Sequence, residues 1–157
     1  MEKQGVFYAV SVGPGDPELL TRQACRVLAD CPVVAAPRMK SGRMLALDIA
    51  AGAVDMQDKT ILPLDFTMER SEAVRENSYR MAAAAIEAEL SAGRDVAMVN
   101  LGDVSVYATA YYILERIRLG RSIWKRLPAC GVSSGPCRSD GSGSTCRADR
   151  LRCSRPC

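Results

Sequence analysis

The chain has 157 residues and a hydrophobic fraction of 48%, which is enough for one domain with a core of its own. It contains no histidine, which excludes His-based catalytic triads, His metal ligands and the usual general base of neutral pH. No apolar run reaches the roughly 18 residues of a membrane span and the start does not resemble a signal peptide, so we expect a cytoplasmic protein with no membrane partner.

Residues 1–120 alternate between strand-like and helix-like segments. Short apolar runs predict strands at Val6–Val12, Val33–Ala36, Thr60–Leu64 and Val96–Leu101. The segments that follow them predict helices at Pro17–Ala29, Arg43–Ala51, Ser71–Ala92 and Ser105–Leu119. Strands this apolar are typical of a parallel sheet buried on both faces. The order of elements therefore predicts a doubly wound, mainly parallel α/β domain over residues 1–120.

The first predicted strand runs into the turn Gly13-Pro14-Gly15-Asp16-Pro17. Two glycines let a ligand approach the backbone closely, and such turns lie where open α/β sheets bind ligands. Asp16 is a good N-cap and Pro17 a good first helical residue. The carboxylates of Asp16 and Glu18 occupy the place where a phosphate would bind, so the turn predicts a ligand loop that is not a phosphate loop. An ordinary strand-to-helix turn is the alternative.

A second glycine turn, Leu101-Gly102-Asp103, follows the fourth predicted strand. Asp103 is either the N-cap of the next helix or a ligand contact. Two such turns on separate strands of one sheet favour a shared ligand crevice.

Residues 121–157 differ from the rest of the chain. They carry a net charge of +6, against −3 for residues 1–120, and five of the seven cysteines. After Leu127 the only large aliphatic residues are Val132 and Leu151, so we expect this tail to be disordered or poorly packed. It has no C-x2-C pair for zinc, and Trp124 is its only aromatic residue, so we expect neither a metal nor a nucleic-acid partner. A disulfide framework conflicts with a cytoplasmic location.

The first turn, read with Leu101-Gly102-Asp103-Val104-Ser105-Val106-Tyr107, resembles the tetrapyrrole methylases, S-adenosylmethionine-dependent enzymes of cobalamin and sirohaem synthesis. Between them, Ala36-Pro37-Arg38 and Leu62-Pro63-Leu64-Asp65-Phe66-Thr67-Met68 are similar to the precorrin-2 (or cobalt-factor II) C20-methyltransferase branch. The chain departs from that pattern by lacking a Pro after Phe66 and by having Val104 where the family has Pro. The resemblance covers roughly residues 5–120.

The resemblance implies that S-adenosyl-L-methionine binds in a cleft between two α/β domains. Carried over by position, its contacts in this chain are Pro14, Leu101, Gly102, Asp103 and Val106. It also implies methyl transfer to C20 of precorrin-2 or cobalt-factor II, with Asp103 and Tyr107 as candidate proton acceptors, and a homodimer. Basic groups that suit the carboxylates of the tetrapyrrole are Arg22, Arg38, Lys40 and Arg43.

The family's second domain is expected to begin near Gly120, where this sequence does not show its pattern. The composition of the tail resembles a GC-rich gene translated in the wrong frame, so we expect a truncated or frameshifted family member. The alternatives are an inactive fragment and another precorrin methyltransferase of the family.

Overall fold

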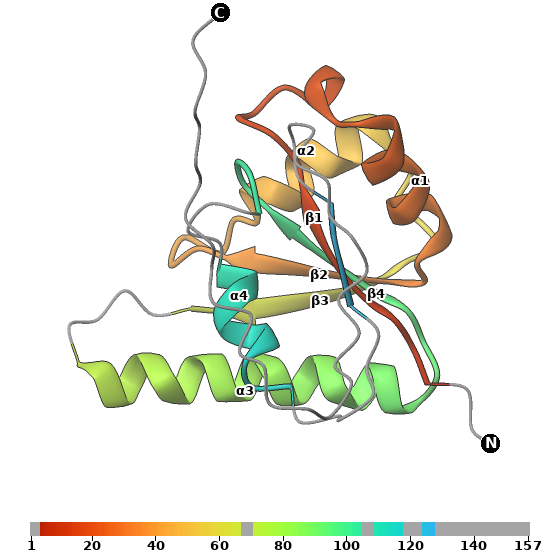
Figure 1. Ribbon diagram of the computed structural model, residues 1–157. Coiled ribbons are helices and arrows are strands. Elements are labelled where there is room, and N and C mark those ends of the chain that lie inside the picture. Colours follow the sequence, from red (N-terminus) through yellow and green to blue (C-terminus); the bar gives the residue numbers. More distant parts are fainter. Residues whose placement is uncertain (1–3, 67–70, 105–108, 118–123, 128–157) are drawn as a thin grey trace, which may run out of the picture.

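The computed structural model describes residues 4–66, 71–104, 109–117 and 124–127. Its centre is a five-stranded parallel sheet with the strand order β3-β2-β4-β1-β5 (Figure 1). The strands are β1 (Phe7–Ser11), β2 (Val33–Arg38), β3 (Thr60–Asp65), β4 (Val96–Asn100) and β5 (Trp124–Leu127). The sheet confirms the predicted parallel α/β fold and all four predicted strands, and their carboxyl ends meet at one edge.

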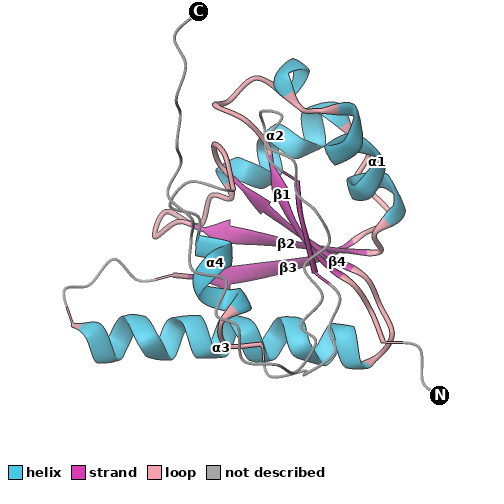
Figure 2. Cartoon of the chain, viewed as in Figure 1, coloured by secondary structure: helices cyan, strands magenta, loops and turns pink. Residues whose placement is uncertain are grey.

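Helices cover both faces of the sheet (Figure 2). On one face, α3 (Glu72–Ser91) and α4 (Thr109–Leu114) pack against side chains such as Phe7 and Met98. On the other face, α1 (Arg22–Asp30) and α2 (Leu45–Ala53) pack against side chains such as Val10 and Val99. Successive residues of a strand point to opposite faces, so each apolar strand supplies both cores.

The predicted helix Pro17–Ala29 is divided in two. Asp16 caps only a short 3₁₀ turn, η1 (Pro17–Leu19), through a 2.9 Å hydrogen bond from the Glu18 N–H. The backbone then becomes extended at Leu20, and α1 begins after Thr21, whose hydroxyl accepts from the Ala24 N–H at 3.1 Å. The prediction of one helix capped by Asp16 was wrong because Thr21 is a second good cap five residues later.

The other helices keep their predicted order with shifted bounds. Ser71 occupies the N-cap position of α3, although its side chain makes no capping hydrogen bond. The predicted start of the last helix at Ser105 lies outside the described residues. Strand β5 lies near the start of the predicted tail, and its backbone pairs with β1 from Phe7↔Trp124 onwards. The remainder of the predicted tail lies outside the described residues.

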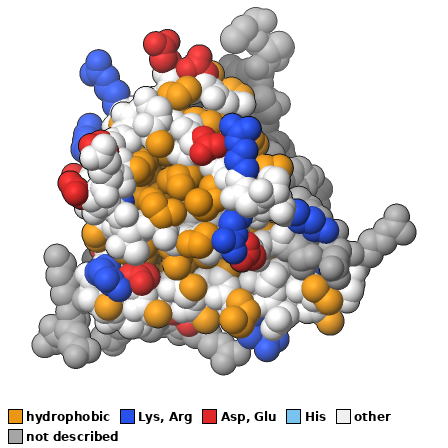
Figure 3. Space-filling view, turned by 180° about the vertical axis from the view of Figure 1, so that it is seen from behind, with side chains coloured by type: hydrophobic (Ala, Val, Ile, Leu, Met, Phe, Trp, Pro, Cys, Tyr) orange, Lys and Arg blue, Asp and Glu red, His pale blue; other side chains and the backbone are white. Residues whose placement is uncertain are grey.

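Helix α2 has an almost entirely apolar sequence, LALDIAAGA. Its Ala46, Ile49 and Ala50 are buried, whereas Leu47 is only partly buried. Seen from behind, the molecule shows hydrophobic side chains gathered at the centre of the face (Figure 3). Among the described residues, no helix combines the length and apolar character that crossing a bilayer requires.

Candidate functional site

The two glycine turns lie side by side at the carboxyl ends of the adjacent strands β1 and β4. The Val12 N–H donates to the Asn100 carbonyl at 3.0 Å, and the Gly102 N–H donates to the Gly13 carbonyl at 2.9 Å. Gly13 and Gly102 thereby form an antiparallel bridge just beyond the parallel ladder. The predicted shared crevice therefore has its two loops in direct backbone contact.

Both bridging glycines have a backbone conformation that other residues rarely adopt. Their φ angles are +73° at Gly13 and +74° at Gly102, in the region where a Cβ is strained. A Cβ at Gly102 would meet no atom within 4 Å, and the same holds for Gly15, whose φ is +148°. At Gly15 and Gly102 the turns therefore border open space, with room beside the backbone for an atom of a ligand.

Ser11 and Asn100, the last residues of β1 and β4, are buried polar residues that stand opposite each other in the ladder. The Ser11 hydroxyl accepts a 2.8 Å hydrogen bond from the Val104 N–H, and the Asn100 side-chain amide donates to the Met98 carbonyl at 3.0 Å. Ser11 thus ties the second turn to the first strand. Sequence reasoning missed both residues, although a polar residue ending an otherwise apolar strand is a usable signal.

The structure brings together four of the five predicted cofactor contacts. Pro14 is exposed in the first turn, and Leu101, Gly102 and Asp103 follow each other in the second, with Leu101 52% exposed. The fifth contact, Val106, lies outside the described residues, as does the candidate proton acceptor Tyr107. Asp103 is half-buried.

Two of the four predicted basic groups are engaged in ion pairs. Arg38, at the end of β2, donates through Nε and Nη2 to the two carboxylate oxygens of Asp65 at 2.7 and 2.5 Å. Arg43 donates through Nε to Asp48 at 2.9 Å. The hydrogen bond from Arg38 lowers the pKa of Asp65, and the same bond raises the pKa of Arg38. The charge of each of these two guanidinium groups is therefore already paired with a carboxylate of this chain.

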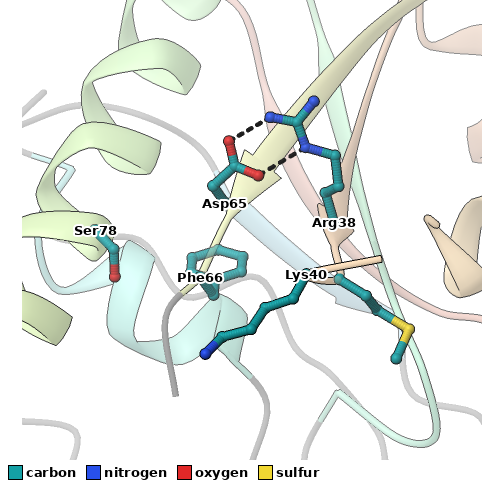
Figure 4. Close-up of a pocket in the computed structure, with 6 residues that line it drawn as sticks. Arg38, Lys40, Asp65, Phe66 and Ser78 are labelled. Atoms are coloured by element: carbon teal, nitrogen blue, oxygen red, sulfur yellow. Dashed lines mark hydrogen bonds and ion pairs between the residues drawn. The ribbon is translucent and has the colours of Figure 1, made fainter. Parts of the chain in front are cut away.

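Arg38 and Asp65 line a cavity of about 250 Å³ at the carboxyl ends of β2 and β3 (Figure 4). The other lining residues are Met39, Lys40, Phe66 and Ser78. This cavity opens at the same sheet edge as the glycine turns, because β2 lies next to β4 and both run in the same direction. Arg22, the remaining basic candidate, is exposed at the start of α1 and does not line this cavity.

Comparison with known proteins agrees with this geometry. Residues 6–129, which are most of the chain, match the family of Tetrapyrrole (Corrin/Porphyrin) Methylases. The chain belongs to the tetrapyrrole methylase family. A curated tetrapyrrole methylase relative, the cobalt-precorrin-2 C(20)-methyltransferase of Salmonella typhimurium, is 36% identical over 114 residues, covering 72% of this chain and 48% of the relative.

Solved tetrapyrrole methylase structures have the same fold. The native uroporphyrin III C-methyltransferase of Thermus thermophilus superposes with a TM-score of 0.54 at 26% identity, covering 79% of this chain and 48% of that one. A structure of the same enzyme with S-adenyl homocysteine gives a TM-score of 0.52 at 24% identity, covering 79% and 44%. The chain thus spans about half the length of the relatives it matches.

Proposed function

We propose that this chain forms part of an S-adenosylmethionine-dependent methyltransferase that methylates C20 of precorrin-2 or cobalt-factor II in cobalamin biosynthesis. The observation that carries the proposal is the bridge between Gly13 and Gly102, which places two open glycine turns at the carboxyl end of the sheet. The similarity to a cobalt-precorrin-2 C(20)-methyltransferase supports the choice of substrate.

The residues of the two turns fit the proposed cofactor. Gly15 and Gly102 leave room where any other side chain would point, so the backbone can lie against a bound molecule. Pro14, Leu101, Gly102 and Asp103, with Val106 beyond the described residues, would hold it. The carboxylates of Asp16 and Asp103 suit a positively charged ligand better than a phosphate. When bound, S-adenosylmethionine supplies a methyl group on a cationic sulfur.

The protein's contribution to such a reaction is mainly positional, because correctly oriented reactants gain large effective molarities. The hydrogen bond from Val104 to Ser11 fixes the second turn against β1, so that Gly102 and Asp103 keep one position relative to Gly13. We assign to Asp103 or Tyr107 the removal of the proton from the methylated carbon. Both residues also have structural alternatives, Asp103 as the cap of the next helix and Tyr107 as a packing residue.

Titration of the full chain with S-adenosylhomocysteine tests the cofactor site. We expect micromolar-range binding, which corresponds to about −8 kcal/mol. Asp103→Ala should weaken binding at least about tenfold, the effect of losing an interaction of a charged group. The exposed Asp58→Ala variant removes the same charge outside the turns and should bind like the wild type. No binding by the wild type at millimolar ligand contradicts the proposed function.

Incubation with precorrin-2 and a ¹³C-methyl-labelled cofactor tests the reaction itself. We expect the labelled methyl group at C20. Label at another carbon contradicts the C20 assignment and supports the alternative of another precorrin methyltransferase. Cofactor binding without any turnover supports the alternative of an inactive fragment. The cytoplasmic location and the homodimer remain part of the proposal, supported by the family resemblance.

A further inference from the structure

We infer that Lys40 binds a carboxylate side arm of the substrate in the cavity at the ends of β2 and β3, while the Arg38–Asp65 pair serves as a fixed wall. The inference rests on the proposed function for the identity of that substrate as a tetrapyrrole. It selects Lys40 from the four basic residues that the sequence predicts as substrate contacts, the others being Arg22, Arg38 and Arg43.

The charge of Arg38 is already paired with a carboxylate of this chain. Arg38 lies directly opposite Asp65 in the ladder between β2 and β3, and its guanidinium donates one hydrogen bond to each carboxylate oxygen. Bidentate pairs of this kind are geometrically specific. The sheet itself brings the two residues together, so the pair forms without any ligand and closes one side of the cavity (Figure 4).

Lys40 is presented differently. It lies in a tight turn that two backbone hydrogen bonds of 2.8 Å close, from the Met39 N–H to the Arg43 carbonyl and from the Gly42 N–H to the Met39 carbonyl. Within the described part of the chain, no carboxylate forms an ion pair with Lys40. Its extended side chain runs beneath the Phe66 ring (Figure 4). Lys40 is thus a positively charged side chain that lines the cavity, on a turn fixed by backbone hydrogen bonds.

The aromatic ring of Phe66 also lines the cavity and is supported by other rings. The Phe66 centroid lies 5.6 Å from that of Tyr79, and Tyr79 stacks on Tyr112 at 5.2 Å with an interplanar angle of 14°. The guanidinium of Arg116 lies over the Tyr79 ring, 5.3 Å from its centroid, and forms an ion pair with Glu76. This chain of contacts from α3 and α4 holds Phe66 in place as an apolar surface.

The size of the cavity decides what it accepts. Its volume of about 250 Å³ is below the roughly 300–1,000 Å³ of pockets that enclose a whole ligand. An apolar wall beside one ammonium group suits a single acetate or propionate arm, whose methylenes contact Phe66 and Met39 while its carboxylate meets Lys40. The macrocycle itself would lie outside, along the sheet edge that continues to the turn after β4.

Fluorescence titration of the full chain with uroporphyrin III, a tetrapyrrole with eight carboxylates, tests this inference. Lys40→Met keeps the stem and removes the charge, and we expect its dissociation constant to rise about tenfold. Lys40→Arg should restore binding to within about twofold of the wild type. Arg26→Met, which removes an exposed cation on α1, is the matched control and should not change the affinity. Circular dichroism of each variant verifies the fold.

Equal weakening by Lys40→Met and Arg26→Met would show a nonspecific charge effect and overturn the inference, as would wild-type affinity in Lys40→Met or no porphyrin binding by the wild-type chain. Titration with S-adenosylhomocysteine separates the two proposals. Lys40-dependent porphyrin binding without cofactor binding upholds the inference and contradicts the methyltransferase. Cofactor binding together with porphyrin binding that does not depend on Lys40 supports the methyltransferase and overturns the inference about Lys40.

Discussion

The hydroxyl of Ser11 and the backbone N–H of Val104 are 93 residues apart in the sequence and 2.8 Å apart in the fold. Both residues are buried, so water cannot replace either partner if the bond is lost. This one contact joins the end of β1 to the turn after β4, and those are the two segments that carry the candidate cofactor site.

Ser11→Ala should lower the free energy of unfolding by about 1–3 kcal/mol, because it leaves the buried Val104 N–H without an acceptor. Urea denaturation measures the change. The exposed Ser91→Ala at the end of α3 is the control and should shift stability by less than about 0.5 kcal/mol. Ser11→Ala should also weaken S-adenosylhomocysteine binding, since the second turn loses its anchor. Unchanged stability would show that the hydrogen bond is not formed in solution.

Gly102→Ala separates backbone strain from obstruction of the site. The φ of +74° predicts a stability loss of about 1–2 kcal/mol, and the new methyl group meets no protein atom. Gly42 has a φ of +83° and is equally unobstructed, so Gly42→Ala is a matched control for strain alone. We expect similar thermal shifts for both variants, with cofactor binding reduced only by Gly102→Ala. Equal cofactor affinity in the two variants would place the ligand elsewhere.

The Arg38–Asp65 pair predicts an acid titration that can be followed directly. The hydrogen bond from Arg38 holds the pKa of Asp65 below its ordinary value of 3.8. Because the folded pKa is depressed, the pair stabilises the fold above that value, and its contribution is lost as the pH falls through the lower folded pKa. Carboxyl ¹³C NMR should place the Asp65 midpoint below 3.8 in the wild type. In Arg38→Gln the midpoint should rise, and an identical midpoint in both proteins would contradict the pair.

Cys31 should resist alkylation in the folded protein. Burial, and then the nearby negative charge of Asp95, raise the pKa of its thiol to about 12, so almost no thiolate exists at pH 8. Iodoacetamide treatment followed by peptide mass spectrometry should leave Cys31 unmodified, whereas the partly buried Cys25 should react. In denaturant Cys31 should react fully. Modification of Cys31 at the same rate with and without denaturant would show that this core region is open.

The sequence by itself predicted the parallel α/β domain and the position of its four main strands. It could do so because the strands are short apolar runs, and the turns after β1, β2 and β4 contain glycine. It also identified the glycine turns that contain Gly13 and Gly102, and the structure adds that both glycines have a positive φ. These are local properties, encoded within a few residues of where they act.

Only the tertiary structure decided how the distant parts combine. It paired Ser11 with Val104, and it placed Asp65 opposite Arg38, which the sequence had offered as a substrate contact. It also added β5, whose short sequence carries no apolar alternation strong enough to predict a strand and whose order comes from pairing with β1. Strand register and long-range hydrogen bonds depend on which segments become neighbours in the sheet, and that information is not contained in any one segment.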